Sequence, residues 1–263
     1  MPHSPADVRS PERIVMREVC RRHALLMTWG LLWVGLALGV DHVSARAPSD
    51  LKLGQLRVGK ILFLGNSITL HGPKADIGWT GNWGMAASTR EKDFVHRLLA
   101  RIRQAAGGDP EVQIRNLADF ERRLLDFDLA QGLKDELEFQ PDLVIVALGE
   151  NATSPQTDAE RDTFARAFDS LLQTLASRGQ PTILVRNSFW PDAAKDKLIE
   201  QATQRAKAVF VDLEKLGADP AHGAKSERPI EHAGVAAHPG DKGMEAIADT
   251  IWRQLRQTAG LPE

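Results

Sequence analysis

The chain has 263 residues, of which 33 are Lys or Arg and 35 are Asp or Glu, so its formal net charge is −2. Hydrophobic residues make up 43% and charged residues 26%, a composition typical of globular proteins that excludes extensive disorder and a collagen-like fibre. This charge provides no basic excess for a phosphate backbone, so no nucleic-acid partner is expected, and the single Cys excludes an internal disulfide and a Cys-based zinc cluster.

The first 47 residues have the parts of a secretory signal peptide. Arg21 and Arg22 precede an uncharged, apolar run over residues 24–40, and the sequence A-R-A ends at Ala47 as a small-residue cleavage site. The run is shorter than the roughly 20 apolar residues that a relaxed membrane span needs. We therefore expect cleavage after Ala47. An uncleaved N-terminal membrane anchor is the alternative, and the paired arginines leave both the Sec and the twin-arginine route open.

Cleavage would leave residues 48–263 as one domain. Removing 47 of the 263 residues leaves 216, with a net charge of −4 and no cysteine, because Cys20 lies in the leader. A chain of that length can bury a sufficient core without disulfides. We therefore expect an exported protein, periplasmic or secreted, that meets the membrane only through its signal segment before cleavage. The sequence does not indicate an oligomeric state.

Five short aliphatic runs follow one another along this domain, at residues 58–65, 112–116, 142–149, 182–187 and 208–213. Continuous apolar runs of this length are typical of strands that are buried on both faces of a parallel sheet. Amphipathic patterns between them predict helices that begin at Phe94, after the Thr157–Glu160 capping box, at Asp192 and at Gly240 or Asp241. The alternation predicts an α/β fold, a single doubly wound, flavodoxin-like five-stranded parallel sheet flanked by helices.

The first predicted strand runs into Gly65-Asn66-Ser67. A Ser on the turn straight after a buried strand is well placed as an exposed nucleophile, and the neighbouring Gly lets the chain turn sharply. Sites in doubly wound folds lie beyond the carboxyl ends of the strands, where this turn falls. Ser67 is therefore a candidate nucleophile, although it could instead only cap the following segment.

Two further polar residues are expected near the same edge of the sheet. Asn151 follows the third predicted strand in the sequence Gly149-Glu150-Asn151, and its side-chain amide could donate a hydrogen bond to a developing oxyanion. His238 stands just before the last predicted helix, and His is the usual base for a Ser because its pKa lies near neutrality. A Ser, an Asn and a His of one sheet can converge on one point.

These three segments resemble, in this order, the motifs of the SGNH (GDSL-like) hydrolase superfamily of esterases and lipases. G-N-S-I-T resembles the family's first block, G-E-N its third and H-P-G-D-K-G-M its fifth. The resemblance spans about residues 58–255 and implies Ser67 as nucleophile, Asn151 as oxyanion donor and His238 as base, with Gly65, Asn66 and Gly149 in the surrounding turns.

The family's second block normally supplies a Gly whose backbone N–H joins the oxyanion hole. The corresponding stretch here, residues 116–122, has no Gly and places Glu121 there. The backbone N–H of Glu121 could still donate, but its side chain would crowd the site. Its carboxylate would also repel an oxyanion unless it pairs with a cation such as Arg122 or Arg186.

The family's usual acid stands three residues before the His, a position that Val235 occupies here. Removing the acid of a Ser triad costs about 10⁴ in turnover, because the imidazole then takes the wrong tautomer. We therefore expect another acceptor for His238 Nδ1. Glu231 is the best candidate side chain, and a backbone carbonyl is the alternative.

A long segment rich in Gly and Trp, residues 71–93, follows the first motif. Long loops at strand ends are commonly functional. Trp79 and Trp83 could stack on a sugar ring or line an acyl pocket, or they could pack the loop onto the domain.

The sequence thus predicts an exported serine ester hydrolase that needs no cofactor or metal and works through an acyl-enzyme on Ser67. Its substrate would be a small-molecule or glycan ester, with deacylation of a carbohydrate suggested by export and the tryptophans. Two alternatives remain: an O-acyltransferase to a sugar hydroxyl, and a carbohydrate-binding domain of this fold with impaired catalysis.

Overall fold

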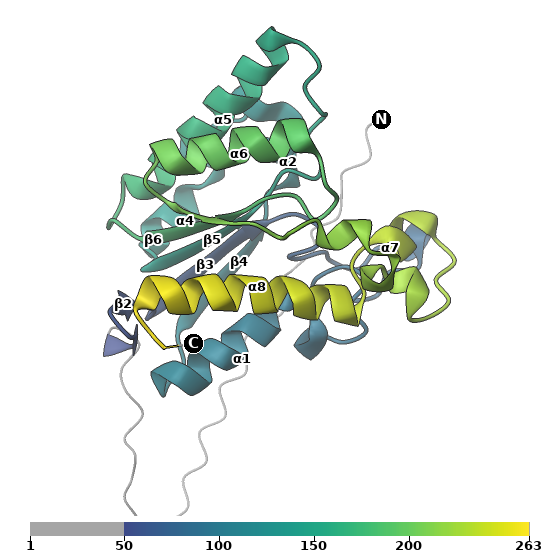
Figure 1. Cartoon of the computed structure of the whole chain (residues 1–263), viewed down its shortest axis with the longest axis horizontal. Helices are drawn as coiled ribbons and strands as arrows, with labels where there is room; N and C mark the ends of the chain where they lie inside the picture. Colours follow the sequence, from purple (N-terminus) through teal and green to yellow (C-terminus); the bar gives the residue numbers. More distant parts are fainter. Residues whose placement is uncertain (1–49, 263) are drawn as a thin grey trace, which may run out of the picture. The chain divides into compact units, whose positions relative to one another are not determined.

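A five-stranded parallel sheet runs through the computed structural model, which describes residues 50–262 (Figure 1). Its strands are β3 (Lys60–Gly65), β4 (Glu111–Asn116), β5 (Leu143–Ala147), β6 (Thr182–Arg186) and β7 (Val209–Val211). They lie in the order β4-β3-β5-β6-β7, so the first strand of the sheet lies between the second and the third. This is the flavodoxin-like arrangement of a doubly wound fold, and the predicted fold class is confirmed.

The central strands are apolar because both of their faces are covered. All five residues of β5 are buried, as are five of the six residues of β3. Ile61 and Phe63 pack into one core cluster, whereas Leu62 and Leu64 pack into a second. Successive strand residues point to opposite faces, so a strand covered on both sides needs a continuous apolar run.

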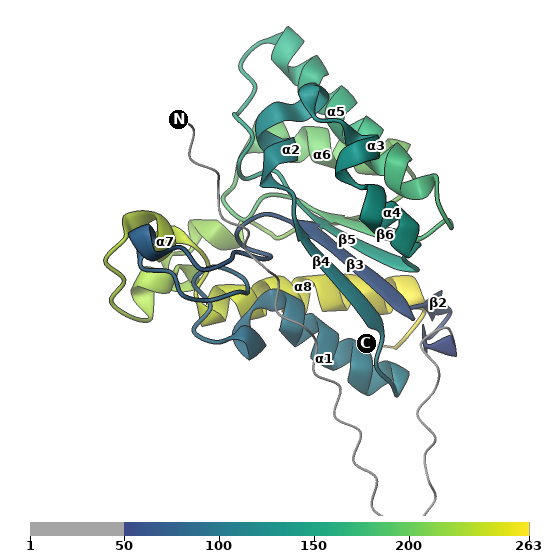
Figure 2. The same cartoon turned by 180° about the vertical axis from the view of Figure 1, so that it is seen from behind.

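Helices cover the two faces of the sheet in separate layers (Figures 1 and 2). On one face lie α1 (Phe94–Ala106) and α8 (Asp241–Ala259). The other carries α2 (Ala118–Arg123), α3 (Leu129–Gly132), α4 (Lys134–Phe139), α5 (Asp158–Ala176) and α6 (Ala193–Arg205). The capping box predicted at Thr157 and Glu160 opens α5, and the Asp192 side chain caps α6. Within residues 50–262, no helix has the length and apolar character needed to cross a membrane.

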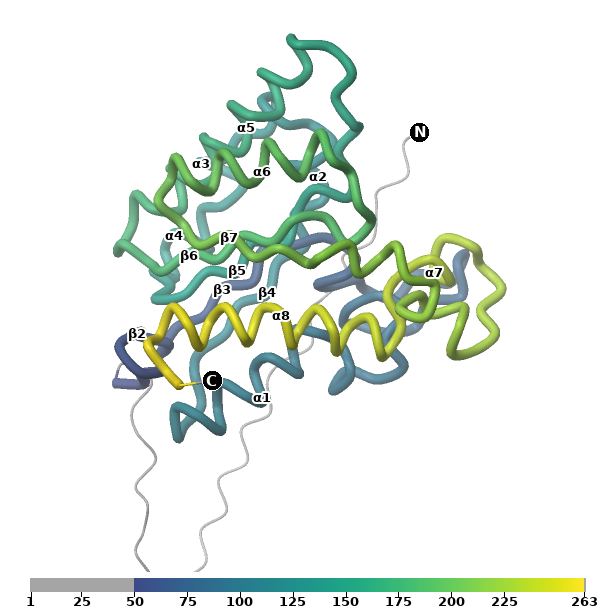
Figure 3. The backbone as a smooth tube through the Cα atoms, viewed as in Figure 1, coloured from purple at the N-terminus to yellow at the C-terminus, as the bar shows by residue number. Residues whose placement is uncertain are grey.

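Several elements were not predicted. A short hairpin, β1 (Lys52–Leu53) with β2 (Leu56–Arg57), precedes the sheet, and the five-residue helix α7 (Ala233–Ala237) precedes α8. Figure 3 shows α7 next to the N-terminal end of α8. The N-cap residue of α8 is Gly240, and the Glu227 carboxylate accepts hydrogen bonds from the first two N–H groups of the helix, those of Asp241 and Lys242. The predicted signal peptide, residues 1–47, lies outside the described residues.

Candidate active site

Ser67 and His238 meet at the carboxyl end of the sheet. The Oγ atom of Ser67 lies 2.7 Å from Nε2 of His238, although 171 positions separate the two residues. Ser67 follows β3, and Asn151 follows β5, the strand that pairs with β3. These two strands flank the point where the strand order reverses, which is where doubly wound folds form their sites.

The turn after β3 is built around the Asn66 side chain. Its Oδ1 accepts a hydrogen bond from the Ile68 backbone N–H at 3.1 Å, and its backbone oxygen accepts from Thr69. A Cβ on Gly65 would lie 1.8 Å from the Thr69 Oγ1 atom, so only Gly fits before this turn. No described residue accepts a hydrogen bond from the backbone N–H of Ser67. That group is therefore available to a ligand.

His238 is oriented by a backbone carbonyl. Its Nδ1 atom lies 2.6 Å from the oxygen of Gly234, four residues earlier in α7. The backbone N–H of His238 bonds to the Val235 oxygen instead, so the Gly234 oxygen does not accept the usual helical bond from the residue four positions later. A carbonyl can only accept, which places the imidazole proton on Nδ1 and leaves Nε2 to accept from the Ser67 hydroxyl.

Glu231, predicted as the orienting acid, does not take that position. The Glu231 side chain is exposed and lines a separate hollow, together with residues 75–78 and its own neighbours 229, 230 and 232. The prediction was wrong because the Gly234 carbonyl, which lacks the usual N–H partner four residues later, already lies within hydrogen-bond distance of His238 Nδ1. The alternative acceptor, a backbone carbonyl, is the one found.

The His238 ring is half-enclosed by the protein. Burial lowers the pKa of His238 below its ordinary value, against the opposing effects of the Gly234 carbonyl and the Glu150 charge. The Trp190 ring packs against the imidazole in a T-shaped contact, with 5.4 Å between the ring centroids. A low pKa keeps the imidazole neutral, the form that a general base needs.

A pocket of about 470 Å³ opens over the Ser67–His238 pair. Nine of its lining residues carry polar or charged side chains, namely Ser67, His71, Lys74, Asn116, Asp119, Arg122, Asn151, His232 and His238. Ile77, Met85, Ala118, Gly234 and Val235 complete the lining. A largely apolar surface with several hydrogen-bonding groups suits a ligand that has both apolar and polar parts. Residues 50–262 contain no group of three or more His, Cys, Asp or Glu side chains arranged to hold a metal ion.

Asn151 reaches this pocket, and the neighbouring Glu121 carboxylate holds its amide. Asn151 Nδ2 donates to Glu121 Oε2 at 2.6 Å, which leaves its second N–H for a ligand. The other carboxylate oxygen, Oε1, accepts from the backbone N–H of Gly149 at 2.5 Å and from Asn66 Nδ2 at 3.1 Å. Glu121 is only 1% exposed and does not line the pocket. Its side chain therefore points beneath the site and does not crowd it.

The cations expected to neutralise Glu121 bind other carboxylates. Arg122 pairs with Asp119, and Arg186 pairs with Glu150. Burial raises the pKa of Glu121, and the nearby Glu150 charge adds to this rise. Four N–H groups thus take the place of a cation around Glu121, those of Gly149 and Asn66 and the two of Asn151.

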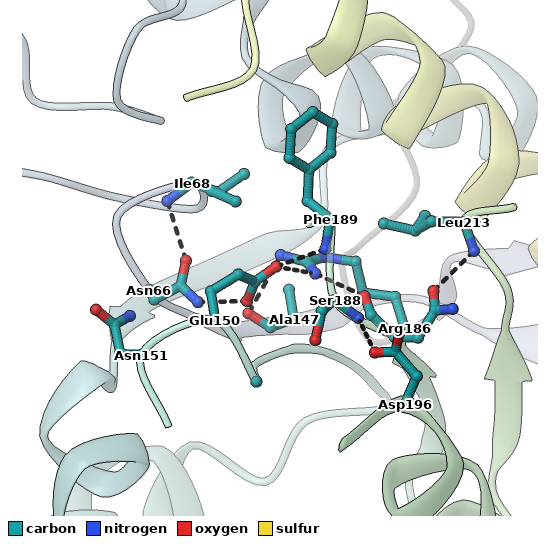
Figure 4. Close-up of polar contacts among 12 residues, drawn as sticks. Asn66, Ile68, Ala147, Glu150, Asn151, Arg186, Ser188, Phe189, Asp196 and Leu213 are labelled. Atoms are coloured by element: carbon teal, nitrogen blue, oxygen red, sulfur yellow. Dashed lines mark hydrogen bonds and ion pairs between the residues drawn. The ribbon is translucent and has the colours of Figure 1, made fainter. Parts of the chain in front are cut away.

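A second buried carboxylate, Glu150, ties this region to β6 (Figure 4). Its Oε1 atom accepts from Arg186 at 2.6 Å and from the Phe189 backbone N–H at 2.9 Å, and its Oε2 atom accepts from Asn66 Nδ2 at 2.6 Å. Both partners of the Glu150–Arg186 ion pair are buried. Burial alone would raise the pKa of Glu150, but Arg186 and the N–H donors hold it below its ordinary value.

Three other residues predicted to lie in the site, Gly65, Asn66 and Gly149, shape the backbone turns around it. Gly65 and Asn66 are fully enclosed in the turn, and Gly149 has a φ of 138°, a backbone conformation that favours Gly. The roles of Gly234 and Glu150 in the site were not predicted, and Arg122 and Arg186 were considered only as partners of Glu121. A side-chain pattern cannot reveal a carbonyl acceptor, whereas the charges at positions 150 and 186, each beside a predicted strand end, were a usable signal.

The tryptophans of the long loop pack against each other and do not face the pocket. Trp79 is 8% exposed and donates its Nε1–H to the His71 carbonyl, and Trp83 donates to the Ala87 carbonyl. Their rings form a T-shaped pair with centroids 5.6 Å apart. Of the two roles considered for them, the structure supports packing of the loop onto the domain.

Comparison with known proteins identifies a family. The model of the GDSL-like Lipase/Acylhydrolase family matches residues 63–246. This confirms the resemblance that the three motifs predict. No curated protein matches the chain.

Two solved structures share the fold at low sequence identity, and a third is less similar. A two-domain esterase active on acetylated mannans, co-crystallised with mannopentaose, is 19% identical with a TM-score of 0.52; the match covers 78% of this chain and 51% of that one. A Bacteroides ovatus protein described as a GDSL-like lipase is 13% identical with a TM-score of 0.50, over 75% and 98% of the two chains. A family two carbohydrate esterase from Cellvibrio japonicus is 20% identical with a TM-score of 0.46, over 79% and 62%. The chain thus spans only about half of the mannan-active esterase and about three-fifths of the family two carbohydrate esterase.

Proposed function

Because the chain belongs to the GDSL-like lipase/acylhydrolase family, a family of ester-bond hydrolases, we propose that it is a serine ester hydrolase that works through an acyl-enzyme on Ser67. The observation that carries the proposal is the 2.7 Å contact between Ser67 Oγ and His238 Nε2. With its proton on Nδ1, the imidazole removes the Ser67 proton as Oγ attacks the ester carbonyl. It then returns that proton to the leaving alcohol, and water releases the acyl group by the same steps.

The negative charge that develops on the carbonyl oxygen needs N–H donors. The backbone N–H of Ser67 and the second Asn151 Nδ2–H are the first two candidates. The backbone N–H of Asp119 is the third, because it lies in the first turn of α2, where N–H groups have no intrahelical partner, and Asp119 lines the pocket. Removing one such donor from a hydrolase costs about 10²–10³ in turnover.

We propose a carbohydrate carrying short acyl esters as the substrate class. The pocket wall supplies imidazole, amide, ammonium and guanidinium groups, which suit the hydroxyl groups of a sugar. The fold shared with an esterase active on acetylated mannans is consistent with this class. The 2.7 Å pair also favours catalysis over the alternative of a binding domain that lost its activity.

Export is a second proposal, and it rests on the leader pattern alone. Expression of the full chain in a bacterial host, followed by N-terminal sequencing of the mature protein, tests it. A first residue of Pro48 in the periplasm or medium supports export with cleavage after Ala47. An intact leader in the membrane fraction would indicate the anchored alternative.

Activity is tested with Ser67→Ala on a panel of p-nitrophenyl esters and acetylated oligosaccharides. The wild type should release acetate or the short acyl group, and Ser67→Ala should lose at least about 10³ of that rate. Equal rates for the two proteins would show that Ser67 is not the nucleophile. Transfer products that exceed hydrolysis when free glycan is added would favour the O-acyltransferase alternative.

A further inference from the structure

We infer that Glu121 and Arg122, consecutive residues of α2, form a clamp that positions the Asn151 amide for the oxyanion; the inference rests on the function proposed above. The amide is held at both ends. Asn151 Nδ2 donates to Glu121 Oε2 at 2.6 Å, and Asn151 Oδ1 accepts from the Arg122 guanidinium at 3.3 Å. A carboxylate only accepts and a guanidinium only donates, so the two contacts together fix which way the amide faces.

The clamp also connects the oxyanion donor to the nucleophile. Glu121 Oε1 accepts from Asn66 Nδ2, and the same Asn66 side chain shapes the Ser67 turn through its Oδ1 contact with Ile68. Glu121 Oε1 also accepts hydrogen bonds from the backbone N–H groups of Gly149 and Asn151, at 2.5 and 3.3 Å. One buried carboxylate therefore joins the turn after β3, the turn after β5 and the donor side chain.

A buried negative charge beside an oxyanion has two opposite consequences. By Coulomb's law alone, Glu121 opposes charge development on the substrate, so its neutralisation should speed the reaction. As a positioning residue, Glu121 keeps the second Asn151 N–H aimed into the pocket, so its neutralisation should slow the reaction. The two effects differ in sign, which makes the inference testable with an isosteric change.

Glu121→Gln supplies that change. If the Gln oxygen retains the contacts of Oε1, its Nε2 atom faces Asn151 Nδ2, and two donors meet. A flip of the Asn151 amide would replace this donor–donor contact by another, because its NH₂ group would then face the N–H donors of the Arg122 guanidinium. We expect kcat to fall about 10- to 100-fold with KM changed less than threefold, since an oxyanion donor acts in the transition state.

A double-mutant cycle with Asn151→Ala shows whether Glu121 acts through Asn151. We expect Glu121→Gln to cost less than twofold in the Asn151→Ala background, although it costs 10- to 100-fold alone. Glu136→Gln, which neutralises another buried carboxylate on α4, is the matched control and should leave kcat unchanged. Equal losses in both backgrounds, or a faster Glu121→Gln enzyme, would overturn the inference.

Arg122→Met covers the case in which Glu121→Gln does not fold. The Arg122 side chain is 56% exposed, so its removal should leave the melting temperature unchanged. We expect Arg122→Met to lower kcat about three- to tenfold in the wild-type background and to have no effect in the Asn151→Ala background. A fall of the same size in both backgrounds would contradict the clamp. A wild-type enzyme with no activity and no labelling of Ser67 by a fluorophosphonate would instead refute the proposed function, a result distinct from any of these.

Discussion

Replacing Glu231 by Ala separates two accounts of how His238 is held. If Glu231 supplied the acid, its removal would resemble loss of the triad acid, about 10⁴ in turnover, or about 5.5 kcal/mol of transition-state stabilisation. In the structure the Nδ1 atom of His238 lies 2.6 Å from the Gly234 oxygen, and Glu231 is exposed. Removing an exposed side chain away from the site changes free energies by about 0.5 kcal/mol or less, a factor of about two in rate.

The assay is the initial rate of p-nitrophenyl acetate hydrolysis over a range of substrate concentrations, with wild type, Glu231→Ala and His238→Ala. We expect kcat/KM of Glu231→Ala within about twofold of wild type. His238→Ala should lose about 10²–10⁴ through loss of the general base. A loss of 100-fold or more in Glu231→Ala, with an unchanged melting temperature, would refute the carbonyl account and restore Glu231 as the acid.

Three further predictions concern titration, stability and the loop. Because burial holds the pKa of His238 below its ordinary value of 6.5, kcat/KM should exceed half of its plateau value at pH 6.5 and fall as the imidazole becomes protonated at lower pH; a pH profile with its acid midpoint above 7 contradicts this. Arg186→Met should lower the free energy of unfolding in urea by about 3–5 kcal/mol, because it leaves Glu150 buried and unpaired, and a loss below 1 kcal/mol would argue against this ion pair. Trp79→Phe should cost about 1 kcal/mol of stability through the lost Nε1–H bond to His71 and leave KM for a glycan ester unchanged, whereas a tenfold rise in KM would place Trp79 in the substrate site.

The sheet could be predicted from sequence because its strands are covered on both faces. Such strands give continuous aliphatic runs, and the runs at 58–65 and 142–149 contain β3 and β5. The parallel topology then brings their carboxyl ends together, which is why Ser67 and Asn151 could be assigned to one site. The short helices between β4 and β5 were missed because each spans only four to six residues, too few for a periodic pattern.

The finer chemistry of the site could not be predicted because it depends on directions that a sequence does not specify. A backbone carbonyl exists at every residue, so nothing in the sequence distinguishes Gly234 as the acceptor for His238. Glu121 could be identified as an anomaly, but whether its carboxylate faces the pocket or the protein interior depends on how α2 packs. The roles of Trp79 and Trp83 could not be predicted for the same reason, since the path of the loop decides whether its aromatic rings contact a ligand or pack on the protein, as these two do.

Trapping the acyl-enzyme tests the central claim most directly. Wild-type protein and Ser67→Ala are each mixed with an excess of p-nitrophenyl acetate, quenched in acid within milliseconds and analysed by mass spectrometry of proteolytic peptides. We expect one acetyl group on the peptide that contains Ser67 in the wild type, and none in the Ser67→Ala protein. Acetylation at another residue, or turnover with no acetylated Ser67 at any quench time, would contradict a mechanism that uses Ser67 as nucleophile.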